Sequence, residues 1–153
     1  MKKSIKYLSF IAIIALSACG GDGPSTPSVD ETAPIIEIVS PNSETTVTPG
    51  RLLNIEANLS DNVDLEDYSV GINFKSDLKS LKTVEEFSFD SRTGKDAAGN
   101  NLPAINGENS LNIKFDIELP AFSKSGIYTL SISTIDSSGN ESAESVDFQI
   151  KTE

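Results

Sequence analysis

Acidic and amide side chains gather in the predicted turns of this 153-residue chain, and their oxygen atoms are the ligands that Ca²⁺ prefers in proteins. The candidate cation ligands are Asp30, Asp61, Asn62, Asp64, Asp136 and Asn140. Strands that run alternately up and down would bring the turns that hold these residues to one pole of the fold. The chain contains no EF-hand loop, and Asp and Asn also cap turns without any metal. A calcium site and simple turn capping are therefore the two alternatives for this group.

The composition argues against an enzyme. The chain has no His, which excludes Ser-His-Asp and Cys-His nucleophile systems and His-based zinc or iron sites. Its single Cys can form neither an internal disulfide nor a metal cluster. The closely spaced carboxylates are Glu85 with Glu86, and Asp64 with Glu66 and Asp67. These stand in polar turns or strand edges rather than in a cleft that would raise a pKa, so we predict a protein without catalytic residues.

The N-terminal segment has the features of a secretory signal peptide. Three lysines within the first six residues precede an apolar run that ends at Leu16 and is too short to span a membrane. The run continues into Leu16-Ser17-Ala18-Cys19, which resembles a bacterial lipobox, where the signal is removed before a Cys that becomes lipidated. We therefore predict that residues 1–18 are a lipoprotein signal peptide and that Cys19 carries the lipid anchor.

Lipidation has consequences for location and charge. Removal of the three N-terminal lysines takes the net charge from −11 to −14. Gly20 stands where an Asp would oppose outer-membrane sorting, so we expect an exported lipoprotein in the outer membrane of a two-membrane bacterium. Residues 19–33 are rich in Gly, Pro, Ser and Thr and are predicted to form the lipidated Cys and a flexible linker.

Residues 34–153 are predicted to form one all-β domain, because apolar and polar residues alternate with a period of two. The predicted strands cover residues 36–40, 53–59, 68–74, 84–89, 111–117, 128–132 and 146–150. Seven short antiparallel strands, each with one solvent-exposed face, favour a two-sheet sandwich, with a small barrel as the alternative. We expect Leu65 to close one end of it, and residues 76–83 to form at most one helical turn. The absence of Trp, with Tyr68 and Tyr128 on core faces, argues against an aromatic platform for sugars.

A long loop from Ser91 to Ser110 is the second candidate site. Loops of more than about 12–15 residues are usually functional or disordered. This one mixes the apolar residues Leu102, Pro103 and Ile105 with polar ones, so we predict that it contacts a protein partner. The alternative is a plain insertion with a short hairpin.

Three segments resemble parts of bacterial immunoglobulin-like domains. They are Asp30-Glu31-Thr32-Ala33-Pro34-Ile35-Ile36, Ser60-Asp61-Asn62-Val63-Asp64-Leu65, and Gly126-Ile127-Tyr128 followed by Asp136-Ser137-Ser138-Gly139-Asn140-Glu141-Ser142. Their order behind a lipobox is similar to that of the family called domain of unknown function 4625. The resemblance covers about residues 30–150 and implies an immunoglobulin-like antiparallel sandwich in the cell envelope, without implying an activity. Family members often carry His-rich stretches after the third strand, which this chain lacks.

These observations together predict a cell-envelope lipoprotein that acts as a binding module. The expected partners are the membrane, through the lipid on Cys19, and an envelope protein or surface ligand. A net charge of −11 argues against nucleic acid, because phosphate binding needs clustered Lys and Arg. No cofactor is expected except Ca²⁺, and the alternative function is a divalent-cation binding domain at the loop pole.

Overall fold

The computed structural model describes residues 29–75, 85–92, 94–95 and 101–152, and every regular element in these residues is a β-strand. The strands are β1 (Ile35–Ser40), β2 (Thr46–Val47), β3 (Leu52–Ser60), β4 (Leu65–Phe74), β5 (Glu85–Asp90), β6 (Ser110–Glu118), β7 (Gly126–Asp136) and β8 (Glu141–Ile150). Cys19 and the segment 76–83 lie outside the described residues. Within the described part of the chain, no helix has the length and apolar character needed to cross a membrane.

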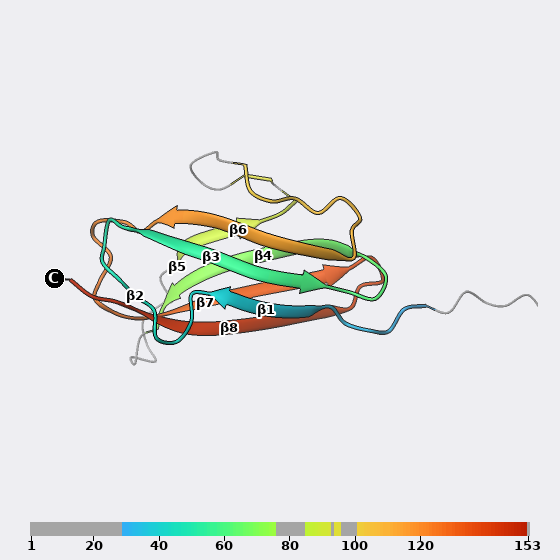
Figure 1. Cartoon of the computed structure of the whole chain (residues 1–153), viewed down its shortest axis with the longest axis horizontal. Coiled ribbons are helices and arrows are strands. Elements are labelled where there is room, and N and C mark those ends of the chain that lie inside the picture. Colours follow the sequence, from blue (N-terminus) through green and yellow to red (C-terminus); the bar gives the residue numbers. More distant parts are fainter. Residues whose placement is uncertain (1–28, 76–84, 93, 96–100, 153) are drawn as a thin grey trace, which may run out of the picture.

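The strands form two sheets that stack into a sandwich (Figure 1). One sheet has the order β1-β3-β6, and the other has the order β2-β8-β7-β4-β5. Strands β3 and β6 pair in one layer, while β4, β7 and β8 pair in the other, as strands B and E face C, F and G in immunoglobulin domains. The predicted immunoglobulin-like sandwich is thus confirmed, and two separate sheets replace the barrel alternative.

The structure has one strand more than the sequence predicts. The additional strand, β2, is two residues long and pairs in parallel with the end of β8. Two residues are too few to show a period of two, so the alternation of apolar and polar residues could not predict β2. All seven strands predicted from alternation are present, with ends that differ by a few residues.

Alternation places the apolar side chains between the sheets. The fully or almost fully buried residues of the two central strands are Leu53, Ile55, Ala57 and Leu59 in β3, and Tyr128, Leu130 and Ile132 in β7. Each buried Leu or Ile side chain contributes about 1.5–3 kcal/mol to stability by leaving water. Leu65 is 2% exposed, as expected for a residue that closes the end of the core.

Two tyrosines anchor loops to this core through their hydroxyl groups. Tyr128 Oη donates a hydrogen bond to the carbonyl oxygen of Lys124 (2.9 Å), which is the arrangement of the tyrosine corner in β-sandwiches. Tyr68 Oη donates to the carbonyl oxygen of Pro103 (2.5 Å) and so holds the long loop. Both rings are at most 1% exposed, which confirms their predicted core positions.

The strands run lengthwise, so the sandwich has two poles (Figure 1). The acidic pole is the end where β1 begins and where β3 and β7 end, drawn on the right. The distal pole is the opposite end, where β6 ends and β7 begins, and the C-terminal end of the chain lies there. The segment that leads into β1 therefore reaches the domain at the acidic pole.

Candidate functional site

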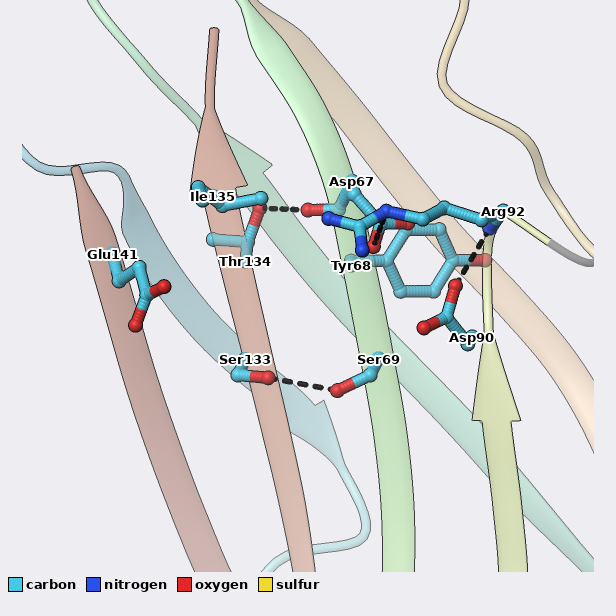
Figure 2. Close-up of a pocket in the computed structure, with 9 residues that line it drawn as sticks. All are labelled: Asp67, Tyr68, Ser69, Asp90, Arg92, Ser133, Thr134, Ile135 and Glu141. Atoms are coloured by element: carbon cyan, nitrogen blue, oxygen red, sulfur yellow. Dashed lines mark hydrogen bonds and ion pairs between the residues drawn. The ribbon is translucent and has the colours of Figure 1, made fainter. Parts of the chain in front are cut away.

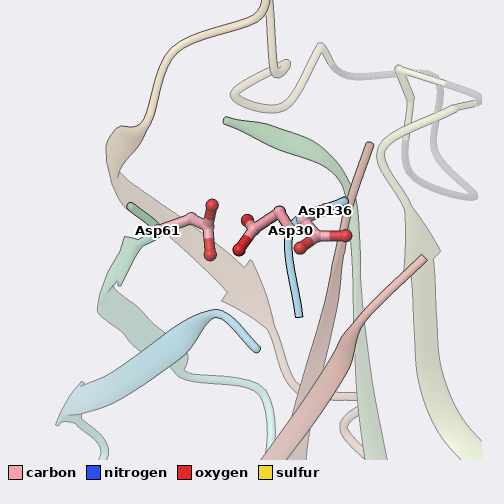
Figure 3. A group of neighbouring side chains, drawn as sticks. All are labelled: Asp30, Asp61 and Asp136. Atoms are coloured by element: carbon pink, nitrogen blue, oxygen red, sulfur yellow. The ribbon is translucent and has the colours of Figure 1, made fainter. Parts of the chain in front are cut away.

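Three aspartates from distant parts of the sequence meet at the acidic pole. Asp30 precedes β1, Asp61 directly follows β3, and Asp136 is the last residue of β7. Each offers one carboxylate oxygen, and these three oxygens lie within 4.8 Å of one another. Figure 3 shows the three side chains side by side. The predicted meeting of Asp30, Asp61 and Asp136 is therefore present in the fold.

One oxygen of each carboxylate organises its own turn. Asp30 Oδ1 accepts from the backbone N–H of Thr32 (3.0 Å), and Asp61 Oδ1 accepts from that of Val63 (2.8 Å). Asp136 Oδ1 accepts from the backbone N–H groups of Ser138 and Asn140, both at 2.8 Å. These are Asx-type turns, in which a short acidic side chain replaces a missing backbone partner. Turn capping therefore occurs at all three aspartates.

Two carboxylate oxygens of the cluster take no part in turn capping. Asp30 Oδ2 and Asp61 Oδ2 are buried and have no hydrogen-bond partner among the described residues. A buried carboxylate oxygen without a partner is costly, because it has lost its water and gained nothing in exchange. Asp136 has no such oxygen, since its Oδ2 accepts from the side-chain amide of Asn140 (2.7 Å). Two of the three aspartates therefore have unused acceptor capacity inside the cluster.

The two predicted amide residues act as donors in this cluster. Asn62 Nδ2 donates to Asp30 Oδ1 (3.1 Å). Asn140 Nδ2 donates to Asp136 Oδ2 and also to the backbone carbonyl of Asp30 (3.1 Å). Asp64 does not join the three-aspartate group, and its Oδ1 instead accepts from the hydroxyl of Ser137.

Hydrogen bonding keeps two of the aspartates ionised. The pKa of Asp30 lies below its usual value, chiefly because the Asn62 side chain and the backbone N–H of Thr32 stabilise the charged form. Burial raises the pKa of Asp136, but the hydrogen bonds from Asn140 and Ser138 outweigh it, so this pKa is also lowered. Negative charge is therefore concentrated at this pole at neutral pH.

A second polar feature lies against the five-stranded sheet. A hollow of about 170 Å³ is lined by Asp67, Tyr68, Ser69, Asp90, Arg92, Ser133, Thr134, Ile135 and Glu141 (Figure 2). Two of its charged groups, Asp67 and Arg92, are paired with each other. Arg92 Nε lies 2.9 Å from Asp67 Oδ2, and the Ser91 hydroxyl donates to Asp67 Oδ1. Asp67 is 5% exposed, so the pair fixes the start of the long loop on β4 rather than presenting a free acid or base.

The apolar residues of the long loop face inward. Leu102 and Ile105 are partly buried and pack against the core, while Pro103 accepts the hydroxyl hydrogen bond of Tyr68. An isolated antiparallel bridge joins Lys95 to Asn101. The loop therefore covers part of the sandwich, and Ala104 and Asn106 are among the residues it exposes.

Sequence reasoning missed an exposed aromatic residue at the distal pole. Phe122 stands in the turn between β6 and β7 and is 96% exposed. The signal was present, because the segment Pro120-Ala121-Phe122-Ser123 places an aromatic residue in a turn between two predicted strands. An alternation pattern assigns apolar residues to the core only within strands, so it could not assign this one.

The fold and the acidic pole define an immunoglobulin-like domain with an aspartate cluster at one end. The profile of DUF4625, a domain of unknown function, matches residues 17–151, and the chain belongs to this family. The resemblance inferred from the three sequence segments is thereby confirmed. No curated protein matches the sequence significantly.

Solved structures show the same fold at low sequence identity. The sporulation control protein Spo0M of Bacillus subtilis matches with a TM-score of 0.55 and 11% identity over 80% of this chain and 51% of its own. Murine CRIg matches with a TM-score of 0.44 and 13% identity, over 80% of this chain and 99% of its own. A Niemann-Pick type C2 protein from the Japanese carpenter ant has a TM-score of 0.49 and 11% identity, over 76% and 89% of the two chains. The chain spans about half the length of Spo0M, and the likeness to Spo0M concerns the fold alone.

Proposed function

We propose that the chain is a lipid-anchored module of the bacterial cell envelope that binds rather than catalyses, and that its acidic pole holds a divalent cation. Family membership and the immunoglobulin-like fold support a binding module, since such sandwiches present loops at their ends for recognition. The absence of His from the sequence and the mutual pairing of Asp67 and Arg92 support a role without catalysis. The lipobox at Leu16-Ser17-Ala18-Cys19 supports the lipid anchor.

One observation carries the cation proposal: two buried carboxylate oxygens without partners, Asp30 Oδ2 and Asp61 Oδ2, belong to a cluster of three aspartates. Oxygens bound to one Ca²⁺ at about 2.3–2.6 Å lie no more than about 5 Å apart, and the three aspartate oxygens meet this limit at 4.8 Å. A cation would satisfy the two free oxygens and reduce the repulsion between like charges.

The ligand chemistry favours Ca²⁺ over other metals. The cluster offers hard carboxylate oxygens and neither His nor Cys, which excludes the soft or nitrogen-rich sites that zinc and copper prefer. Mg²⁺ requires a near-ideal octahedron of ligands at about 2.0–2.1 Å, whereas Ca²⁺ tolerates irregular sites. With three protein carboxylates and water completing the shell, the expected dissociation constant is about 0.1–1 mM, as in extracellular calcium modules.

Thermal unfolding of the chain with and without millimolar Ca²⁺ tests the cation. At about ten times the dissociation constant, binding stabilises a domain by about 1.4 kcal/mol, which corresponds to a rise in Tm of about 5 °C. Asp61→Asn removes one free oxygen and should abolish the rise. Asp116→Asn is the matched control, because Asp116 is exposed on the outer face of β6 and accepts from Asn54 away from the cluster. Equal Tm values with Ca²⁺ and with Mg²⁺ would overturn the calcium assignment.

The protein partner is proposed to contact the long loop. Ala104 is exposed in that loop, whereas Ser145 is exposed on β8, so the two positions sample different surfaces. A photo-crosslinking amino acid at position 104 should give adducts in native membranes, and one at position 145 should not. Adducts of equal yield at both positions, or none at 104, would contradict the loop contact. Loss of acyl labelling in Cys19→Ala, together with fractionation of the two membranes, tests the anchor and its location.

A further inference from the structure

The turn between β6 and β7 presents an aromatic side chain to solvent. Ser123 N–H donates to the Pro120 carbonyl (3.0 Å), which closes the turn and places Ala121 and Phe122 at its tip. Phe122 is 96% exposed, the largest exposure among the large hydrophobic residues of the described chain. Leu52, which pairs with Glu118 at the start of β3, is 63% exposed. The distal pole therefore exposes three apolar residues, Ala121, Phe122 and Leu52, which are called the tip below.

The tip is held rigidly. Gly50 N–H donates to the Leu119 carbonyl, and Leu119 N–H donates to the Arg51 carbonyl, both at 3.0 Å, so the β2–β3 and β6–β7 turns are joined side by side. On the other flank, the Tyr128 hydroxyl fixes the Lys124 carbonyl. The turn that contains Phe122 is therefore ordered by backbone hydrogen bonds, and Phe122 is exposed in this ordered turn.

The two turns at the tip carry basic side chains, although the chain as a whole is acidic. The two turns, Thr48–Arg51 and Leu119–Ser125, contain Arg51 and Lys124 and no acidic residue, while Glu118 directly precedes the second. Arg51 and Lys124 are both exposed. The aspartate cluster lies at the other pole, separated by the 11 residues of β7, or about 35 Å. That separation is several Debye lengths at physiological salt. The negative charge of the acidic pole therefore does not repel anionic groups that approach the tip.

We propose that this tip docks on an anionic lipid surface. An exposed aromatic ring flanked by Lys and Arg is the composition of segments that insert at a bilayer interface, where the ring enters the headgroup boundary and the cations meet lipid phosphates. A protein partner is disfavoured by size, since a stable interface needs about 800 Å² from each side, whereas two apolar side chains on a convex turn offer much less.

Tethering makes so small a contact effective. If Cys19 carries a lipid, the 11 residues from Cys19 to Val29 span at most about 40 Å when extended. This maximum is close to the distance between the poles, so the tip reaches the bilayer that holds the anchor when the linker is nearly fully extended. The contact is then intramolecular, and its effective concentration raises a weak affinity. The docked tip and the anchor together would fix the orientation of the domain on the membrane.

The absence of Trp from the chain gives a direct test. Phe122→Trp introduces a single indole, and its fluorescence is recorded with the full processed protein on vesicles of phosphatidylethanolamine and phosphatidylglycerol. We expect a blue shift, quenching by brominated lipids and loss of both effects at high salt. Val63→Trp is the matched control, because Val63 is 54% exposed at the acidic pole. In a second variant, Lys124→Gln added to Phe122→Trp should weaken docking of the tip about fivefold, measured as the ratio of docked to undocked indole from the quenching.

Three results would overturn the proposal. The first is emission from Phe122→Trp that is the same with and without vesicles. The second is equal quenching of Phe122→Trp and Val63→Trp, which would indicate a non-specific approach. The third is a shift that requires native membrane proteins and is absent with pure lipid, which would assign the tip to a protein partner. These readouts report where residue 122 lies and measure neither Ca²⁺ binding nor acylation of Cys19, so the tip can fail while the proposed function holds.

Discussion

The Asn140 side-chain amide donates to the backbone carbonyl of Asp30 over 3.1 Å, although the two residues are 110 positions apart in the sequence. The same amide donates to Asp136 Oδ2, so one side chain joins the segment before β1 to the turn after β7. Asp30 lies within the predicted linker, residues 19–33, so this hydrogen bond ties the last part of the linker to the domain. A cation bound by Asp30, Asp61 and Asp136 would strengthen the junction, because it would hold the same three segments through their carboxylates.

Asn140→Ala is expected to destabilise the domain by about 1–3 kcal/mol, because it leaves Asp136 Oδ2 buried without its partner and frees the Asp30 carbonyl. Urea unfolding measures this as a lower midpoint at an unchanged slope. Asn112→Ala is the control, since Asn112 is exposed on β6 and donates only to Asn58 at the surface. That change should stay within about 0.5 kcal/mol. Equal losses for the two variants would contradict a structural role for the Asn140 bridge.

The sequence predicts the strands and the aspartate cluster well for one physical reason. A half-buried strand alternates apolar and polar residues, so its position can be predicted from the sequence. When consecutive strands run in opposite directions, successive turns lie at alternate poles. Asp30, Asp61 and Asp136 follow from that argument, while Asp64 does not. Asp64 lies only three residues beyond Asp61, but its side chain turns toward Ser137, and strand order cannot show the direction of a side chain within a turn.

Other features depend on contacts that no local pattern encodes. The pairing of β2 with β8 involves two residues on each strand, and the contact of Leu102 and Ile105 with the core depends on how the long loop folds back. The ion pair between buried Asp67 and exposed Arg92 is a further example, because Asp67 stands where an alternating strand would place a solvated acid.

Stability should fall in acid and remain level near neutral pH. The pKa values of Asp30, Asp136 and Asp147 are lowered in the folded protein, for Asp147 chiefly by hydrogen bonds from Lys75 and Thr129. The unfolded state therefore binds protons more readily, so the stabilisation is complete above pH ~4 and is lost as the pH falls through the lowered pKa values. Without His, no side chain with an ordinary pKa titrates from about pH 5.5 to 8.

Urea midpoints recorded across this pH range without Ca²⁺ provide the measurement. A plateau at neutral pH and a decline below about pH 4 are expected. Stability that increases as the pH falls from 7 to about 5 would instead mean that repulsion among the three carboxylates outweighs their hydrogen bonds.

Tyr68→Phe should release the long loop without unfolding the domain. The ring remains to pack against Phe89, whose centroid is 5.5 Å away, but the hydrogen bond to the Pro103 carbonyl is lost. The expected loss of stability is about 1 kcal/mol, with faster amide exchange confined to residues 101–109. Tyr128→Phe is the control, because its lost bond to Lys124 affects the turn at the opposite pole. Faster exchange of residues 101–109 in Tyr128→Phe as well would show that the effect is not local.

Two glycines offer a test of close packing against backbone conformation. Gly126 has a φ of +152°, and a Cβ atom there would lie 2.6 Å from Phe74 Cε2. The Phe74 ring packs edge-on against Tyr128 at a centroid distance of 5.2 Å, so it cannot move without disturbing the core. Gly139 has a φ of +90°, and a Cβ atom there would meet nothing within 4 Å.

Gly139→Ala should therefore cost only the backbone strain, about 1–2 kcal/mol. Gly126→Ala adds overpacking and should cost about 1–3 kcal/mol more, and near-UV circular dichroism should show the displaced aromatic pair. Equal unfolding free energies for the two variants would mean that the Phe74 ring has room to move and that the contact with Gly126 does not limit the packing of this pole.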